Sequence, residues 1–227
     1  MFKRLSMMVI FIFLFLEMCV FPVHAEILGF DTYDLSAEEK ADIIQTTNLK
    51  VIQDDSHKEG IRCFDVNRDG SYALAMGTGS NCRVYVYDPN GAFLYGYRFY
   101  CDGDYAIGFH EDALAIYSLR GNTIALYDAA GTCTGVQRAA DTSVNDVRIS
   151  GILNRTSMDM GDRRYMLERD MDMGDSYSRL VSVSQSGEKA VLYDISSEHS
   201  LRQSIFIIAV VGFFLFVIIG ICRKRIK

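Results

Sequence analysis

Residues 83–91 read RVYVYDPNG, and residues 123–131 repeat the pattern as TIALYDAAG. A third copy, KAVLYD, occupies residues 189–194. Each copy is rich in β-branched and aromatic residues and then reaches Tyr-Asp, which the first two copies follow with a turn that closes on glycine. Runs of this kind are typical of β-strands that end in tight turns. Residues 61–203 are therefore predicted to be mainly antiparallel β-sheet.

The strands around the first two copies come in units of four. Each copy is preceded by two shorter apolar runs joined by a polar turn: residues 63–66 with 72–75, and residues 105–109 with 113–117. Asp88 and Asp128, the equivalent aspartates of the two units, stand 40 residues apart. Four short strands in about 40 residues is the repeat length of a β-propeller blade.

These residues resemble the blades of the WD-repeat and NHL-like β-propeller families. Three dipeptides stand where the WD dipeptide ends the third strand of a blade: Tyr87-Asp88, Tyr127-Asp128 and Tyr193-Asp194. Asp69-Gly70 stands in the turn between the first two strands. The resemblance implies antiparallel four-stranded blades, and it implies no particular activity because many unrelated functions share this architecture.

The number of blades is small for a closed ring. The 140 residues between Ile61 and Ser200 hold about three and a half units, whereas closed propellers have about four to eight blades. We expect a partial, propeller-like array with exposed strand edges. Three arrangements stay open: residues 47–60 supply further strands, the blades form an open stack, or several chains complete a ring.

The segment before the repeats, residues 26–60, contains a signal for one short helix. Ser36 is followed three residues later by Glu39, which is the spacing of a capping box. The sequence predicts a helix over residues 34–46.

Residues 1–25 have the composition of a signal peptide. Lys3 and Arg4 precede an apolar run, and Val23 and Ala25 stand at the small-residue positions of a cleavage site. We expect cleavage after Ala25. An uncleaved signal anchor is the alternative.

Residues 204–222 are predicted to form a transmembrane helix. The uncharged run begins at Ile205, ends at Cys222 and is 18 residues long, which is about 27 Å of helix against a hydrocarbon core of about 30 Å. The basic tail, residues 223–227, places this end in the cytoplasm by the positive-inside rule. The sequence thus predicts a single-pass membrane protein with its N-terminal domain outside the cytoplasm.

The formal charge of −6 divides unevenly along the chain. The signal region carries +1, the exported part −11 and the tail +4. A nucleic-acid partner is excluded, because phosphate binding requires clustered lysine and arginine. The acidic exterior favours cationic or divalent partners, and a protein or other exported ligand is the expected partner.

Four cysteines lie in the exported part: Cys63, Cys82, Cys101 and Cys133. An even number outside the cytosol is compatible with two disulfides, in one of three connectivities. The pair Cys82–Cys101 is favoured because the two residues flank a predicted hairpin. The alternative is that some are free, buried thiols.

Two stretches are candidate metal sites. Asp65, Asn67 and Asp69 alternate as in the first half of a calcium loop, although Met76 stands where that loop needs glutamate, and an ordinary polar turn explains the same residues. The sequence MDMGD occurs twice, and its thioethers suit Cu(I): Met158, Met160, Met171 and Met173. A strand with one buried face, or an acidic loop, would show the same Met-Asp alternation.

No catalytic set is recognisable. There is no Gly-x-Ser-x-Gly elbow, and the carboxylate pairs Asp102/Asp104 and Glu111/Asp112 would serve a glycosidase only if the fold set them opposite one another. The sequence therefore predicts an anchored binding or assembly module that needs no cofactor. A membrane-bound hydrolase using blade-loop carboxylates, and a calcium- or copper-binding protein, are the alternatives.

Overall fold

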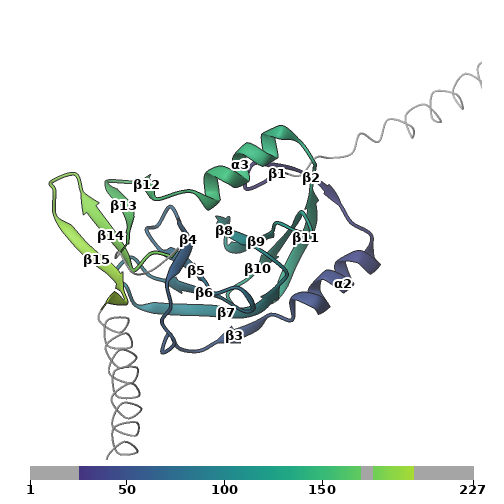
Figure 1. Ribbon diagram of the computed structural model, residues 1–227, viewed down its shortest axis with the longest axis horizontal. Helices are drawn as coiled ribbons and strands as arrows, with labels where there is room; N and C mark the ends of the chain where they lie inside the picture. The colour runs from purple at the N-terminus through teal and green to yellow at the C-terminus, as the bar shows by residue number, and fades with distance from the viewer. Residues whose placement is uncertain (1–25, 170–175, 197–227) are drawn as a thin grey trace, which may run out of the picture.

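The computed structural model describes residues 26–169 and 176–196. Most of these residues lie in three antiparallel sheets, with two helices beside them (Figure 1). Within these ranges no helix has the length and apolar character needed to cross a membrane. The predicted signal peptide and transmembrane helix lie outside the described residues.

The first sheet is the first predicted blade. Its four successive strands form an antiparallel meander: β4 (Ile61–Val66), β5 (Tyr72–Met76), β6 (Gly79–Tyr87) and β7 (Phe93–Cys101). A fifth strand, β3 (Lys50–Ile52), pairs with β7. Residues 47–60 thus supply a strand, but this strand extends an existing sheet and does not build another blade.

The second sheet contains the second predicted blade. Its meander has four strands: β8 (Tyr105–His110), β9 (Ala113–Ser118), β10 (Thr123–Tyr127) and β11 (Cys133–Ala139). Two strands from the start of the described chain extend it: β2 (Phe30–Asp34) pairs with β11, and β1 (Glu26–Ile27) pairs with β2. The predicted units of four strands are confirmed in both sheets.

The third sheet also has four strands in chain order: β12 (Ser157–Met160), β13 (Arg163–Glu168), β14 (Arg179–Ser184) and β15 (Lys189–Asp194). The dipeptide Tyr193-Asp194 ends the fourth strand here, so its predicted place at the end of a third strand is wrong. Three strands of the sheet, β12, β13 and β14, come before the strand that ends in this dipeptide, so that strand is the fourth.

The repeated aspartate accepts a backbone N–H from the residues that follow it in all three copies. Asp88 Oδ1 accepts the backbone N–H of Ala92 at 2.8 Å, and Asp128 Oδ1 accepts that of Thr132 at 2.7 Å. Asp194 Oδ1 accepts the N–H of Ser196 at 2.7 Å. Gly91, which follows the first copy, has φ +86, a conformation that only glycine adopts without strain. The motif recurs because it ends a strand and starts a turn.

Helix α2 (Ala37–Thr47) confirms the predicted capping box. Glu39 N–H donates to Ser36 Oγ at 3.2 Å, and Ser36 N–H donates to the Glu39 carboxylate at 3.0 Å. None of the residues of α2 is buried. The helix therefore lies on the outside of the sheets, near β7 and β11 (Figure 1).

Helix α3 (Ser143–Leu153) interrupts the region predicted to be mainly β-sheet. Thr142 caps it by accepting the N–H of Asn145 at 3.2 Å, and Ile152 is buried beneath it. The Asn145 amide bonds back to Asp31 on β2, accepting its N–H at 3.1 Å. The helix is thereby fixed on the second sheet.

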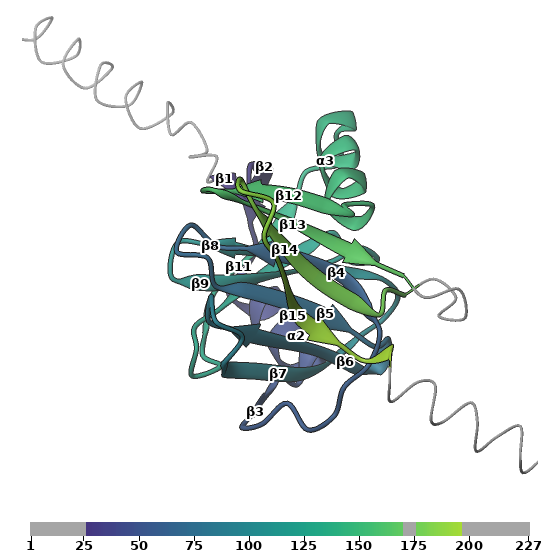
Figure 2. The same ribbon diagram turned by 90° about the vertical axis from the view of Figure 1, so that its left-hand side faces the viewer.

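The three sheets form an open stack with the first sheet in the middle. One core lies between the first and second sheets, and another lies between the first and third sheets. Figure 2 shows the third sheet in front of the first. The outer face of the second sheet is covered mainly by α3, and Ile27 and Leu28 of the β1–β2 hairpin belong to the same core. The described residues therefore form no closed propeller, because α3 covers the face on which a next blade would stack.

Candidate functional site

A pocket of about 780 Å³, here named the loop-end pocket, opens where the three sheets meet at one end of the stack. It gathers five of the seven candidate metal ligands and the carboxylate pair Glu111/Asp112. Its lining comes from the β1–β2 turn, the β4–β5 turn, the β8–β9 turn and β12: Leu28, Gly29, Asp65, Val66, Asn67, Arg68, Asp69, Phe109, His110, Glu111, Asp112, Met158 and Met160.

Asp65 lies at the inner wall of this pocket and is only 8% exposed. Its Oδ2 accepts the backbone N–H of Phe109 at 2.8 Å, and its Oδ1 accepts a guanidinium N–H of Arg155 at 2.6 Å. Burial raises the pKa of Asp65 above its usual value, although both bonds favour the ionised form. The carboxylate therefore joins the first sheet to the second sheet and to the segment after α3.

The other two oxygens of the predicted calcium loop serve their own turn. Asn67 Oδ1 accepts the N–H of Arg68 at 2.8 Å, and Asp69 Oδ1 accepts the N–H of Ser71 at 2.9 Å. The bonds to Ser71 lower the pKa of Asp69. Across residues 26–169 and 176–196, no three His, Cys, Asp or Glu side chains are grouped to hold a metal ion. Calcium binding stays a prediction without a donor set to support it.

The first Met-Asp-Met copy forms β12, as a strand with one packed face would. Met158 and Met160 are half-buried and pack against the core between the first and third sheets, while Asp159 is exposed. The Met158 sulfur accepts an Arg155 N–H at 3.5 Å. The second copy, with Met171 and Met173, lies outside the described residues, so the Cu(I) site stays a prediction.

The two carboxylate pairs considered for hydrolysis lie in different surroundings. Asp102 accepts a hydrogen bond from Arg120 at 2.7 Å, and Asp104 is bound to a different arginine, Arg62. Glu111 and Asp112 are successive residues of the β8–β9 turn, at the loop-end pocket. The geometry gives hydrolysis no specific support.

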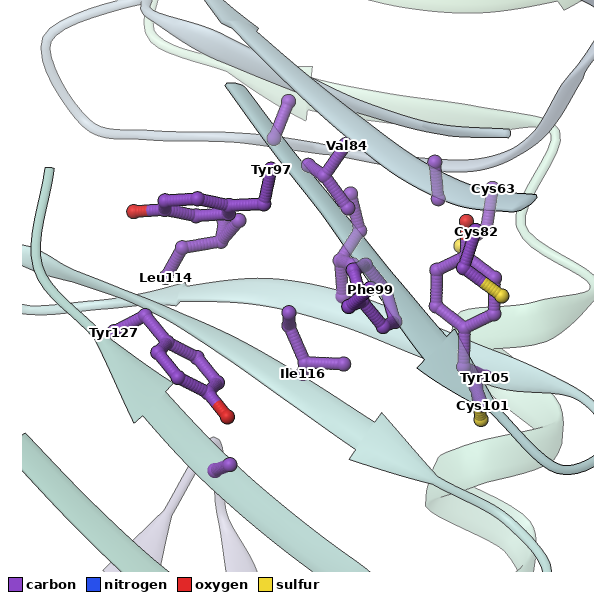
Figure 3. Packing of buried hydrophobic residues seen from close by; sticks show 14 of the residues in the cluster. Cys63, Cys82, Val84, Tyr97, Phe99, Cys101, Tyr105, Leu114, Ile116 and Tyr127 are labelled. Atoms are coloured by element: carbon purple, nitrogen blue, oxygen red, sulfur yellow. The ribbon is translucent and has the colours of Figure 1, made fainter. Parts of the chain in front are cut away.

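The four cysteines are free thiols in the structure, and three of them are buried. Figure 3 shows Cys63 and Cys82 beside Tyr105, with Cys101 nearby. Cys82 lies opposite Phe99, so it is diagonal to Cys101 across β6 and β7. Diagonal partners have Cα atoms about 7–8 Å apart, more than the roughly 4.4–6.8 Å of a disulfide. A Cys82–Cys101 disulfide stays a prediction that requires local movement of the strands.

Arg155 and Phe109 are the site residues that sequence reasoning missed. They stand 90 and 44 residues from Asp65, and no local pattern connects them to it. The one signal in the sequence is Asp65 itself, which stands in an apolar strand. An aspartate buried in such a strand requires a cationic or N–H partner.

No known protein-family model matches the chain, and no curated protein of known function matches it in sequence. Its function has to be argued from the pocket and the fold.

Proposed function

We propose that the chain is a non-catalytic binding module, held at the outer face of a membrane, that binds a cationic group of an exported partner in the loop-end pocket. The charge of the pocket carries this proposal. Its lining has four carboxylates and one guanidinium, and Arg155 is bound to one of those carboxylates. The two arginines thus offset two of the four negative charges, and an excess of negative charge remains.

The pocket also has apolar walls. Leu28, Phe109, Met158 and Met160 line it together with the carboxylates. A lysine or arginine side chain presents an aliphatic stem with a cationic end, so it can contact both kinds of wall. Methionine side chains adapt their shape to what they contact. A basic side chain of a peptide segment is the occupant whose chemistry fits best.

The position of the pocket suits a binding module. Its lining comes from turns of the first and second sheets and from β12 of the third, and turns held by a rigid scaffold commonly carry recognition. Asp65, near the end of β4, ties that strand to Phe109 near the end of β8 and to Arg155 after α3. The site is therefore built before a partner arrives, which reduces the entropy cost of binding.

The membrane part of the proposal rests on the sequence alone. The apolar run that begins at Ile205 and the basic tail after it predict one orientation, with the acidic domain outside. Protease added to intact cells should digest the domain and leave the tail protected. Protection of the domain in intact cells, and digestion only after lysis, would contradict this orientation.

The binding test uses the full chain in nanodiscs of neutral lipid, so that basic probes do not bind the bilayer. Three peptides that share an apolar sequence and differ at one position, in lysine, glutamine or glutamate, are titrated by fluorescence anisotropy. The lysine peptide should bind best, and added salt should weaken its binding.

The variant Glu111→Gln/Asp112→Asn should weaken the lysine peptide by about fivefold, the scale of partly solvated ion pairs. Glu188→Gln is the control, because Glu188 is an exposed carboxylate that does not line the pocket. Equal binding of the glutamine peptide, or equal effects of the two variants, would refute the proposal.

A further inference from the structure

A second pocket, separate from the loop-end pocket, lies between the first and second sheets and is closed on one side by α2. We name it the α2 pocket. Its volume is about 340 Å³, at the lower end of the roughly 300–1,000 Å³ of small-molecule sites. It is lined by Asp42, Ile43, Thr46, Thr47, Phe99, Tyr100, Cys101, Asp102, Ile116, Ser118, Arg120, Gly121, Thr123, Ala125, Tyr127 and Arg138.

The α2 pocket contains a buried hydroxyl without a hydrogen-bond partner. Tyr127 is only 2% exposed, and its hydroxyl makes no hydrogen bond. The Thr47 hydroxyl on α2 lies near it and lowers the pKa of Tyr127, but the two are not in hydrogen-bonding geometry, and Thr47 donates its proton to the Ile43 carbonyl at 2.7 Å. In Figure 3 the Tyr127 hydroxyl points away from Tyr97 and Leu114. A buried polar group left unpaired is destabilising, so it marks a place where a ligand atom belongs.

A second orphaned donor lines the same pocket. The Nε–H of Arg138 is buried and has no hydrogen-bond partner. The nearest ion pair of Arg138, with Glu39, is loose at 3.6 Å. Arg120, by contrast, is bound to Asp102 at 2.7 Å. Arg138 is therefore the cation of this pocket with capacity to bind an anion.

The two donors come from different positions along neighbouring strands. Arg138 is opposite Thr123, four residues along β10 from Tyr127, which is about 13 Å of strand. Between them the lining is apolar, with Phe99, Ile116 and Ala125. Burial raises the pKa of Tyr127 to about 12, so its hydroxyl keeps its proton at neutral pH.

We propose that the α2 pocket binds a small amphipathic carboxylic acid. The carboxylate accepts from Arg138, an apolar or aromatic body lies along Ile116 and Ala125, and a polar group at the far end bonds to the Tyr127 hydroxyl. The carboxylate follows from the guanidinium, because hydrogen bonds between ionised partners are about twice as strong as neutral ones.

The test uses three fluorinated probes and ¹⁹F NMR on the full chain in neutral nanodiscs. 3-Fluoro-4-hydroxyphenylacetate carries both polar ends, 3-fluorophenylacetate lacks the hydroxyl, and 3-fluorotyramine replaces the carboxylate by an ammonium group. The hydroxylated acid should bind best, and the amine should bind at least tenfold more weakly.

Arg138→Gln should weaken both acids by about 10-fold or more, the scale of a hydrogen bond to a charged group. Arg98→Gln is the matched control, because Arg98 is exposed on β7 and does not line the pocket. Tyr127→Phe should weaken the binding of the hydroxylated acid alone, by about 3- to 10-fold. The hydroxylated acid should then bind this variant with the same affinity as 3-fluorophenylacetate.

Tyr127→Phe should fold normally, because the hydroxyl that it removes has no hydrogen bond to lose. Three results would each overturn the proposal: no probe binds, the amine binds as tightly as the acids, or Arg138→Gln behaves like Arg98→Gln. The loop-end pocket is not involved in this test, so its outcome is independent of the proposed function.

Discussion

Asp65 is the one carboxylate that is buried in the part of the chain that the structure describes. Its two oxygens bond to Phe109 and to Arg155, which come from different parts of the chain. At neutral pH, Arg155→Met should lower the free energy of unfolding by about 3 kcal/mol, because it leaves a buried charge without a partner. Asp65→Asn should cost less, since its neutral amide oxygen still accepts the Phe109 N–H.

The pH dependence separates these two variants. The folded-state pKa of Asp65 lies above its usual 3.8, so on acidification the folded protein takes up this proton before the unfolded chain does. The stabilisation from that proton is complete below the unfolded pKa and is lost as the pH rises through the folded pKa. The deficit of Arg155→Met should therefore shrink toward pH 3.8, and that of Asp65→Asn should not. Urea unfolding at several pH values measures both, and a pH-independent deficit for Arg155→Met would contradict the assignment.

The cysteines should differ in reactivity. Burial raises the pKa of Cys63 to about 12 and that of Cys82 to about 11, so both stay protonated thiols at mildly alkaline pH. Cys133 is only half-buried. Maleimide labelling of the folded chain, followed by peptide mapping, should find Cys133 modified well before Cys63 and Cys82. Equal labelling rates for Cys63 and Cys133 would show that the core is not as described.

The same mapping tests the predicted Cys82–Cys101 disulfide. If the exported protein contains it, neither cysteine is labelled after unfolding without reductant, and both are labelled after reduction. Labelling of both without reductant identifies free thiols.

At the residue scale, the sequence predicts which side chains are unusual better than it predicts what they do. The spacing of Asp65, Asn67 and Asp69 fits either a calcium loop or an ordinary polar turn, and the structure places Asp65 in an ion pair and the other two in a turn. Turn bonds between near neighbours can be inferred from spacing. The bond from Asp65 to Arg155 cannot, because it depends on how distant sheets meet.

Among the elements, α2 combines a capping box with limited packing, chiefly through Ile43. It buries no residue, so the capping box at Ser36 is a large part of what holds its first turn. Ser36→Ala should raise amide hydrogen-exchange rates in α2 by about fivefold and leave those of β5 and β6 unchanged. An equal increase in the central strands would show that α2 does not open independently.

The stability of helix α3 can be raised by a substitution at Gly151. A Cβ atom added there meets nothing within 4 Å. Gly151→Ala should therefore stabilise the protein by about 0.5–1 kcal/mol, by reducing the backbone entropy of the unfolded chain. The contrasting variant is Gly96→Ala, whose Cβ would lie 2.8 Å from the Val84 carbonyl oxygen. Thermal unfolding should show a higher Tm for the first and a lower Tm for the second, and a lower Tm for both would contradict the prediction.

The strands were easier to predict than α3. Tyr-Asp-x-x-Gly marks the end of a strand because its aspartate accepts turn N–H groups, which is a local property. Helix α3 has no such signal: Val144 and Val147 are 57% and 74% exposed, so its apolar residues do not form one buried stripe. Its cap, Thr142, has Asn145 where a capping box has glutamate or glutamine.

On the scale of the whole molecule, contacts between sheets hold the stack together. The Tyr72 hydroxyl, on the first sheet, donates to the Leu192 carbonyl on β15 at 3.0 Å. Tyr72→Phe should cost about 1 kcal/mol and should speed hydrogen exchange mainly in β14 and β15. Tyr33→Phe is the control, since Tyr33 is 47% exposed. An unchanged exchange pattern in the third sheet would show that this bond does not hold the two sheets together.

The repeat length predicts the content of each sheet but not the order in which the sheets stack. A propeller would place the third sheet on the second, and here it packs on the first. The cause is α3, which covers the outer face of the second sheet and carries the chain across. The order in which the sheets stack depends on the side chains of α3. Since α3 is not part of the repeat, the repeat length does not predict this order.

The position of β15 has a mechanical consequence. It is an edge strand, paired only with β14, and it is the last strand of the described chain. A pulling force applied at residue 196 would load the β14–β15 ladder and the bonds of Leu192 and Tyr193 to Tyr72 and Glu59, and it would peel β15 away before any other strand. The first and second sheets would bear that load only after the third sheet had unfolded. The third sheet is therefore expected to unfold first under force and to protect the other two.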